Sequence, residues 1–113
     1  MGRDTIVRAL EERRVLSLVY AGGEARTVQP HAMLRKPDGT ELLEAYQLRG
    51  PSESGNEAGW KHFALSQIAD VRLLDDRFEP RRDFRPVDSE SGQLVARVSS
   101  RDPSRARGST GER

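Results

Sequence analysis

The chain lacks cysteine altogether, which excludes disulfide scaffolds, thiol nucleophiles and cysteine-based zinc sites. It also lacks any apolar run near the ~20 residues of a membrane span, and its N-terminus has no apolar stretch of the signal-peptide kind. Aromatic residues make up only 5% of the chain, and arginine supplies all but two of the 19 basic residues. A length of 113 residues leaves room for one domain. We therefore expect a single cytoplasmic domain without membrane contact.

An excess of charge of one sign is missing as well, since the formal net charge is +1. Residues 1–86 carry 14 basic and 14 acidic side chains, so the electrostatic footprint of a strong nucleic-acid binder is absent. From Asp88 onward Ser, Arg and Gly dominate, and the large apolar residues are only Leu94, Val95 and Val98. Such a segment cannot bury enough surface to offset the entropy of ordering it. The sequence predicts a folded domain over residues 1–86 and a disordered polar tail over residues 87–113.

The first segment has helical periodicity. Asp4 is a suitable N-cap, and the apolar residues after it recur on one face, namely Ile6, Val7, Ala9 and Leu10. Arg13 and Arg14 suit the last turn, because cations are stabilised at the negative end of the helix dipole. The pattern predicts a helix over residues 5–14.

After residue 14 the pattern changes to short β-branched and aromatic runs separated by turn residues. We expect strands over residues 15–20, 25–29, 31–36, 40–48, 60–65 and 71–74, with Pro30 closing the second of them. Strands this short and numerous do not suit βαβ units and favour an antiparallel barrel or curled sheet. The predicted fold class is mainly β, with one N-terminal helix closing an open end.

Four stretches then occur in a recognisable order. They are Val19-Tyr20, Arg26-Thr27-Val28-Gln29-Pro30, Glu41-Leu42-Leu43-Glu44-Ala45-Tyr46 and Trp60-Lys61-His62-Phe63-Ala64-Leu65-Ser66-Gln67-Ile68, with Phe78 after them. In this order the chain resembles the WYL domain, a bacterial module, from about Ile6 to Phe78. The resemblance implies a small antiparallel β-barrel of the SH3-like or Sm-like type. It also implies a link to transcriptional regulation, because the module usually follows a DNA-binding helix-turn-helix.

The departures from the family bear on function. The name-giving Trp-Tyr-Leu is Glu41-Leu42-Leu43 here, and Ala64 and Gln67 stand where the family has arginine. In the family these cationic positions are thought to meet anionic ligands, including nucleotides and single-stranded nucleic acid. The resemblance therefore implies Arg26, Arg49 and Lys61 as the remaining ligand-binding cations. No helix-turn-helix precedes residue 4, so a transcriptional role is expected to need another polypeptide.

Five further readings of single residues stay open at this point. Arg26 lies mid-strand and either faces solvent or points a bidentate fork at a phosphate. His31 is either a surface or half-buried residue, or a ligand donor or pH-sensitive switch. Tyr20, Tyr46 and Trp60 either pack in the core or form a stacking platform for bases. We favour the core for Tyr20. Alternation along residues 60–65 allows either Phe63 or the set of Trp60 and His62 to face inward, and the family resemblance implies that Phe63 points into the barrel.

Catalysis and metal binding have little support in the residue pattern. No carboxylate or third histidine lies at ligand spacing from His31 and His62, so we expect no metal or cofactor. Ser17 and Ser66 lack the context of a nucleophile elbow. We expect a binding protein and not an enzyme.

Two functional hypotheses follow. The first is a regulatory module that senses an anionic ligand, a nucleotide or short single-stranded nucleic acid, through Arg26, Arg49 and Lys61, with Trp60 or Tyr46 stacking. The second is a protein–protein interaction or oligomerisation module that has lost ligand binding, and it acts by self-association or by docking a DNA-binding regulator. Ala64, Gln67 and the balanced charge favour the second.

Overall fold

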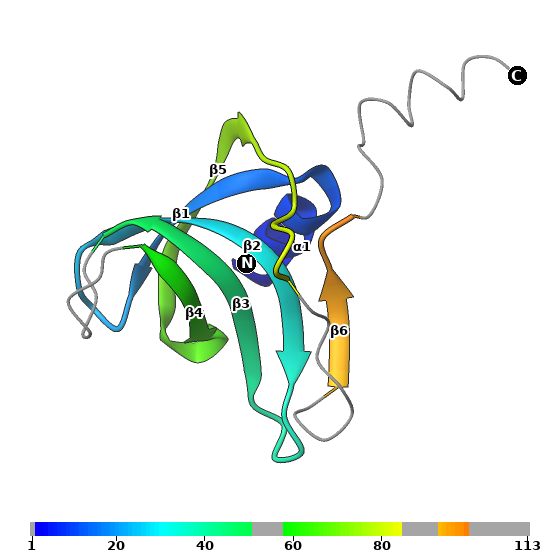
Figure 1. The fold of residues 1–113 in the computed structure, drawn as a ribbon. Helices are drawn as coiled ribbons and strands as arrows, with labels where there is room; N and C mark the ends of the chain where they lie inside the picture. The colour runs from blue at the N-terminus through cyan, green and yellow to red at the C-terminus, as the bar shows by residue number, and fades with distance from the viewer. Residues whose placement is uncertain (1, 51–57, 85–92, 100–113) are drawn as a thin grey trace, which may run out of the picture.

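The computed structural model describes residues 2–50, 58–84 and 93–99 (Figure 1). Within these ranges the chain is mainly β with one N-terminal helix, which confirms the predicted fold class. The elements in chain order are α1 (Gly2–Glu12), β1 (Arg14–Tyr20), β2 (Ala25–Arg35), β3 (Glu41–Arg49), β4 (Gly59–Ala64), the 3₁₀ helix η1 (Leu65–Gln67), β5 (Ile68–Arg77) and β6 (Gln93–Arg97).

The strands form one strongly curved antiparallel sheet (Figure 1). Its order is β4-β3-β2-β1-β5, and β6 joins it by pairing with β2. The first half of β2 pairs with β1. The second half of β2 extends past β1 and pairs with β6 on that edge. The two end strands of the path, β4 and β5, are joined directly by η1. The sheet therefore curls back on itself, as the run of short strands predicts.

Helix α1 begins and ends earlier than the sequence predicts. It spans residues 2–12 rather than 5–14, so Asp4 lies in its first turn instead of capping it. Arg13 adopts a φ of 57°, and a left-handed residue of this kind ends a helix. The reversal lets β1 begin at Arg14 without a loop. Arg13 and Arg14 therefore serve as connections between elements and not as the last helical turn.

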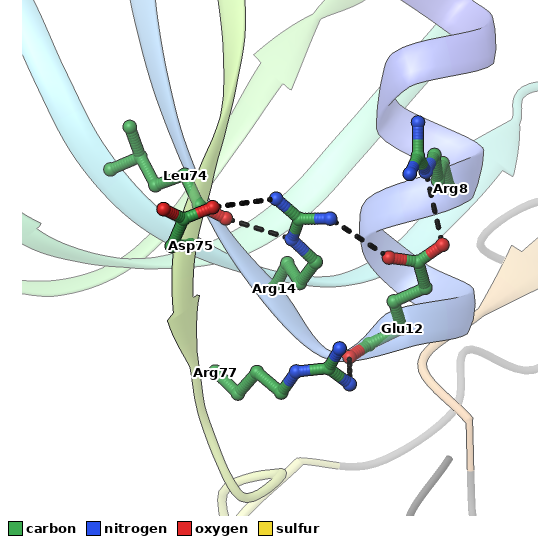
Figure 2. Close-up of polar contacts among 6 residues, drawn as sticks. All are labelled: Arg8, Glu12, Arg14, Leu74, Asp75 and Arg77. Carbon is green, nitrogen blue, oxygen red and sulfur yellow. Dashed lines mark hydrogen bonds and ion pairs between the residues drawn. The ribbon is translucent and has the colours of Figure 1, made fainter. Parts of the chain in front are cut away.

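Figure 2 shows how the end of α1 is fixed to β5. The Nε atom of Arg14 donates to the carbonyl of Leu74 at 2.8 Å, and its terminal nitrogens contact carboxylate oxygens of Glu12 at 3.0 Å and of Asp75 at 3.3 Å. The other carboxylate oxygen of Glu12 accepts from Arg8 at 3.0 Å. Hydrogen bonds from Arg14 and Arg8 hold the pKa of Glu12 below its usual value. The helix is thus tied to the far strand of the sheet by a charged network.

The two strands predicted over residues 25–29 and 31–36 are one strand, β2, which runs through Pro30. The pairing with β3 shifts register between Pro30 and Ala32, and His31 has no partner residue opposite it. Proline lacks an N–H and is tolerated where a bulge interrupts the ladder. The proline therefore marks a bulge inside a strand and not the end of one. Strand β5 is likewise longer than the predicted 71–74.

The prediction of a disordered tail is wrong for residues 93–99. Strand β6 pairs with β2 over Ala32–Arg35, and Val98 is 1% exposed. The backbone N–H of Val98 donates to the carbonyl of His31 at 2.8 Å. Pairing with the open half of β2 supplies backbone hydrogen bonds that a polar composition does not reveal. The remaining parts of the predicted tail, 87–92 and 100–113, lie outside the described residues.

The inner face of the curved sheet carries the main core. Met33, Leu43 and Phe63 lie in one row across β2, β3 and β4, and Phe63 is 1% exposed, as predicted. Helix α1 adds its buried face, which consists of Ile6, Ala9 and Leu10. The outer face carries the alternate rows, one of which joins Tyr46 to Trp60.

Candidate ligand site

The seven residues that the sequence predicts as site residues are divided between the two faces of the sheet. Lys61 is two residues before buried Phe63 in β4 and so lies on the inner face. Trp60, its neighbour, points to the outer face, where Tyr46 lies opposite it. Tyr20 and Arg26 belong to the inner group through their contacts with Phe63. A cation and an aromatic residue that are adjacent in sequence are therefore separated by the sheet.

Four inner-face residues form what we name the Arg26 cluster, namely Tyr20, Arg26, Gln47 and Phe63. The guanidinium carbon of Arg26 lies 5.5 Å from the ring centres of both Tyr20 and Phe63, and these rings meet edge to face at 4.9 Å. Its Nη1 donates to the side-chain oxygen of Gln47 at 3.3 Å. A flat cation on two aromatic faces is favourable and fixes the plane in which its N–H groups can be approached.

The chain approaches Arg26 closely at Gly50. Gly50 has a φ of 123°, and a Cβ there would lie 3.0 Å from both Cα and Cγ of Arg26. Gln47, which is fully buried, donates from Nε2 to the carbonyl of Gly50 at 3.0 Å. Only glycine allows this approach, so the end of β3 is held against the arginine.

Arg26 lacks an acidic counter-ion in the part of the chain that the structure describes. Its Nε is buried without a hydrogen-bond partner. By contrast, Arg3, Arg8, Arg14 and Arg35 all form ion pairs with carboxylates. Leaving a buried donor unsatisfied costs roughly 1–3 kcal/mol, and more for a charged group. A guanidinium without a carboxylate partner is suited to bind an anionic ligand.

The other two predicted cations lie at the same end of the sheet. Strand β3 ends at Arg49, which is paired with Thr27 near the start of β2, and β4 begins at Gly59 opposite Gln47. Arg49 is exposed and forms no ion pair within the described ranges, whereas Lys61 is half-buried. Lys36 follows β2 and lies at the opposite end of the sheet. The fold therefore gathers the three predicted cations at one end of the sheet and leaves Lys36 at the other.

The remaining candidates form a separate group on the outer face, the outer cluster, which we define as His31, Tyr46, Trp60, Phe78 and Phe84. The ring of His31 is central, with ring centres of Trp60, Phe78 and Phe84 at 4.8, 5.3 and 5.2 Å. Tyr46 meets Trp60 edge to face at 5.6 Å. Packing thus accounts for these rings, and they do not converge with Arg26.

Residues 78–84, which we name the strap, contribute Phe78 and Phe84 to this outer cluster and cover its other members. The guanidinium of Arg81 lies 3.4 Å from the ring centre of Tyr46, and its backbone N–H donates to Nε2 of His31 at 3.0 Å. The indole N–H of Trp60 donates to Asp83 at 2.9 Å. The sequence carries no signal for Arg81 and Asp83, because charged residues that follow a proline are typical of a solvated turn. The same holds for Gln47, since a glutamine in a strand carries no signal of burial.

The comparisons with known proteins agree with the order of motifs in the chain. A family model described as the WYL domain matches residues 3–73. The chain belongs to the WYL domain family. No curated protein and no solved structure matches it. WYL domains are generally regulatory, ligand-sensing modules and occur in DNA-binding transcription regulators.

The two positions where this WYL domain departs from the family's arginines lie beside the Arg26 cluster. The backbone N–H of Ala64 donates to the hydroxyl of Tyr20 at 3.0 Å. The carbonyl of Gln67 accepts from the N–H of Ala21 at 2.9 Å. Arginine side chains at positions 64 and 67 would extend from backbone that lies next to Tyr20 and Ala21. Because this chain has Ala64 and Gln67 instead, Arg26 is the arginine that contacts Tyr20.

Two grooves lie elsewhere on the WYL domain. One, of about 310 Å³, lies between the start of α1 and η1, and its neighbour, of about 600 Å³, extends to the turn before Glu41. Between them Glu41, at the first name-giving position, accepts from Arg3 at 3.1 and 3.2 Å and from Arg35 at 2.9 Å. Hydrogen bonds from Arg3 and Arg35 lower the pKa of Glu41. None of the seven predicted site residues lines either groove.

Within residues 2–50, 58–84 and 93–99, the structure brings no three histidine, aspartate or glutamate side chains together in an arrangement that could hold a metal ion. No helix in the same ranges is long and apolar enough to cross a membrane.

Proposed function

We propose that this WYL domain is a regulatory binding module, and not an enzyme, whose ligand is a nucleotide or a short single-stranded nucleic acid. Arg26, Arg49 and Lys61 meet the phosphates at the end of the sheet where β3 ends and β4 begins. Tyr20 supplies the aromatic surface there, because Trp60 and Tyr46 lie on the other face. Such a module acts in transcription together with a DNA-binding regulator.

The observation that carries this proposal is the state of Arg26. It is a half-buried guanidinium with a buried, unsatisfied Nε, no carboxylate partner among the described residues, and two aromatic rings beneath it. A phosphate bound at the accessible part of this guanidinium would supply the missing negative charge. Desolvation by the rings strengthens that interaction relative to one at an exposed arginine.

The test is fluorescence anisotropy of a labelled single-stranded oligodeoxynucleotide, titrated with the full chain at several salt concentrations. Binding should weaken with salt, with a log–log slope of about −2 for three phosphate contacts. Arg26→Ala should weaken binding at least tenfold, and Lys61→Ala should flatten the slope by about 0.7. Lys36→Ala, at the opposite end of the sheet, is the matched charge control and should change neither quantity.

A gain-of-function variant makes the test two-sided. Ala64→Arg combined with Gln67→Arg restores the family's cations beside Tyr20 and should strengthen binding. If neither the wild type nor this double variant shows salt-dependent binding, the anion-binding proposal fails. Sedimentation of the same samples then tests the alternative, an interaction or oligomerisation module, through the concentration dependence of the apparent mass.

A further inference from the structure

His31 is the buried histidine of the chain, with no exposed surface, and both of its ring nitrogens are engaged. Nδ1 lies 2.9 Å from the carbonyl oxygen of Gln29, and Nε2 lies 3.0 Å from the backbone nitrogen of Arg81 in the strap. The bulge at Pro30–Ala32 places this side chain beneath the strap. His31 is therefore one of the points where the sheet holds the strap, and it is the one whose bond depends on a titratable ring.

The two partners determine the protonation state of the ring. A carbonyl oxygen only accepts and a backbone N–H only donates, so Nδ1 carries the proton and Nε2 is a bare acceptor. This is a neutral imidazole. A protonated ring would present two N–H donors, and its Nε2–H would face the N–H of Arg81. The bond to the strap cannot survive protonation.

The charges around His31 come from three directions. Burial lowers the pKa of His31, and so does the positive charge of Arg81 on the strap. The hydrogen bond to the Gln29 carbonyl and the negative charge of Asp83 raise it, but the net shift is downward. On β3 and β4, the adjacent row of the outer face holds Glu44 and His62, 3.9 Å apart, and burial raises the pKa of Glu44. From β6, Arg97 lies over the ring of Phe84 at 5.6 Å. A proton on His31 would thus add a second cation beside Arg81.

We propose that the strap is a pH-sensitive latch, in which protonation of His31 releases residues 81–84 and uncovers Trp60 and Tyr46. The backbone bond from Phe78 to the carbonyl of Arg13, at 3.0 Å, does not involve His31 and holds the start of the strap in place. Release breaks the Arg81–His31 bond and frees the Arg81 Nε, which donates to Gln29 at 3.0 Å. The uncovered surface is the aromatic row that the closed strap occupies.

The direction of the pH effect follows from linkage. In the closed state the pKa of His31 lies below 6.5, whereas in the open state the ring meets solvent and returns toward that value. The stabilisation of the closed strap is complete above pH 6.5 and is lost as the pH falls toward the pKa of the closed state. The latch opens on acidification.

Trp60 reports on the strap directly, because it is the only tryptophan in the chain. Between pH 8 and pH 5 its emission should shift to the red and its quenching by acrylamide should increase at least twofold, with a midpoint below 6.5. His31→Gln should abolish the transition, since a glutamine amide can accept from Arg81 and donate to Gln29 without titrating. His62→Gln removes the only other histidine, whose side chain is 57% exposed, and should leave the transition intact.

A measurement on the wild type keeps the proposal testable even if His31→Gln does not fold. The ¹⁵N chemical shifts of the His31 ring should show the Nδ1–H form at pH 7.5 and a titration midpoint below 6.5. A midpoint at or above 6.5, or loss of the fluorescence transition in His62→Gln, overturns the proposal. So does loss of the far-UV circular dichroism in step with the fluorescence, because the whole sheet and not the strap would then be opening.

Discussion

The two faces of the same sheet are stabilised in different ways. The inner face is closed by apolar side chains in register, with Met33, Leu43 and Phe63 in one row, and α1 packs against β1, β2 and β5. The outer face is closed by rings around a histidine and by polar bonds from the strap, through Arg81 and Asp83. Apolar burial is insensitive to pH, whereas a hydrogen bond to an imidazole depends on its protonation.

The C-terminal end of the family match separates the residues that stabilise the inner face from the strap that covers the outer face. The match ends at residue 73, and the inner row lies inside it. The strap and β6 follow it, yet Phe78, Phe84 and Val98 are all buried in the core. The family pattern therefore accounts for the inner core and for the Arg26 cluster. The strap that covers the outer face lies after residue 73, where the match to the family model ends.

The largest difference between the faces should appear in a matched pair of phenylalanines. Phe63→Ala empties a site that is 1% exposed and enclosed by three strands, so it should cost ~3–5 kcal/mol of unfolding free energy. Urea unfolding followed by circular dichroism measures this loss. A loss below ~1 kcal/mol would show that the inner face does not carry the core.

Phe84→Ala is the counterpart on the outer face and should cost less, about 2–3 kcal/mol. Phe84 is 9% exposed and lies on the strap, which can settle toward the sheet when the ring is removed. The same urea experiment compares the two variants directly. A cost equal to or above that of Phe63→Ala would mean that the outer cover is as rigid as the inner core.

The smallest effect concerns a single hydroxyl. Tyr20→Phe removes the acceptor of the Ala64 N–H on the inner side and should cost ~1 kcal/mol. Tyr46→Phe is the control on the outer face, where the hydroxyl forms no hydrogen bond within the described residues, and should stay within about ±0.5 kcal/mol. Equal effects of the two substitutions would remove this difference between the faces.

Much of the candidate site was accessible from the sequence, but its arrangement was not. The cations Arg26, Arg49 and Lys61 were identified by residue type and by resemblance, and antiparallel pairing brings them to one end of the sheet. The assignment of Trp60 and Tyr46 to the same site depended on their register. Since one step along a strand changes the face, adjacency of Trp60 and Lys61 in sequence means separation in space.

The sequence by itself determined the local structure: a short amphipathic helix, turns at glycine and proline, and the alternation of faces along β4, of which the family resemblance selected the face of Phe63 as the core. These depend on residues close together in the chain, where propensity and periodicity act. The tertiary structure decided the rest, namely the bulge at His31, the ordering of β6 and the strap over Trp60. Each of these depends on an edge or face that exists only once distant strands have paired, since a polar segment becomes ordered when such a surface satisfies its backbone.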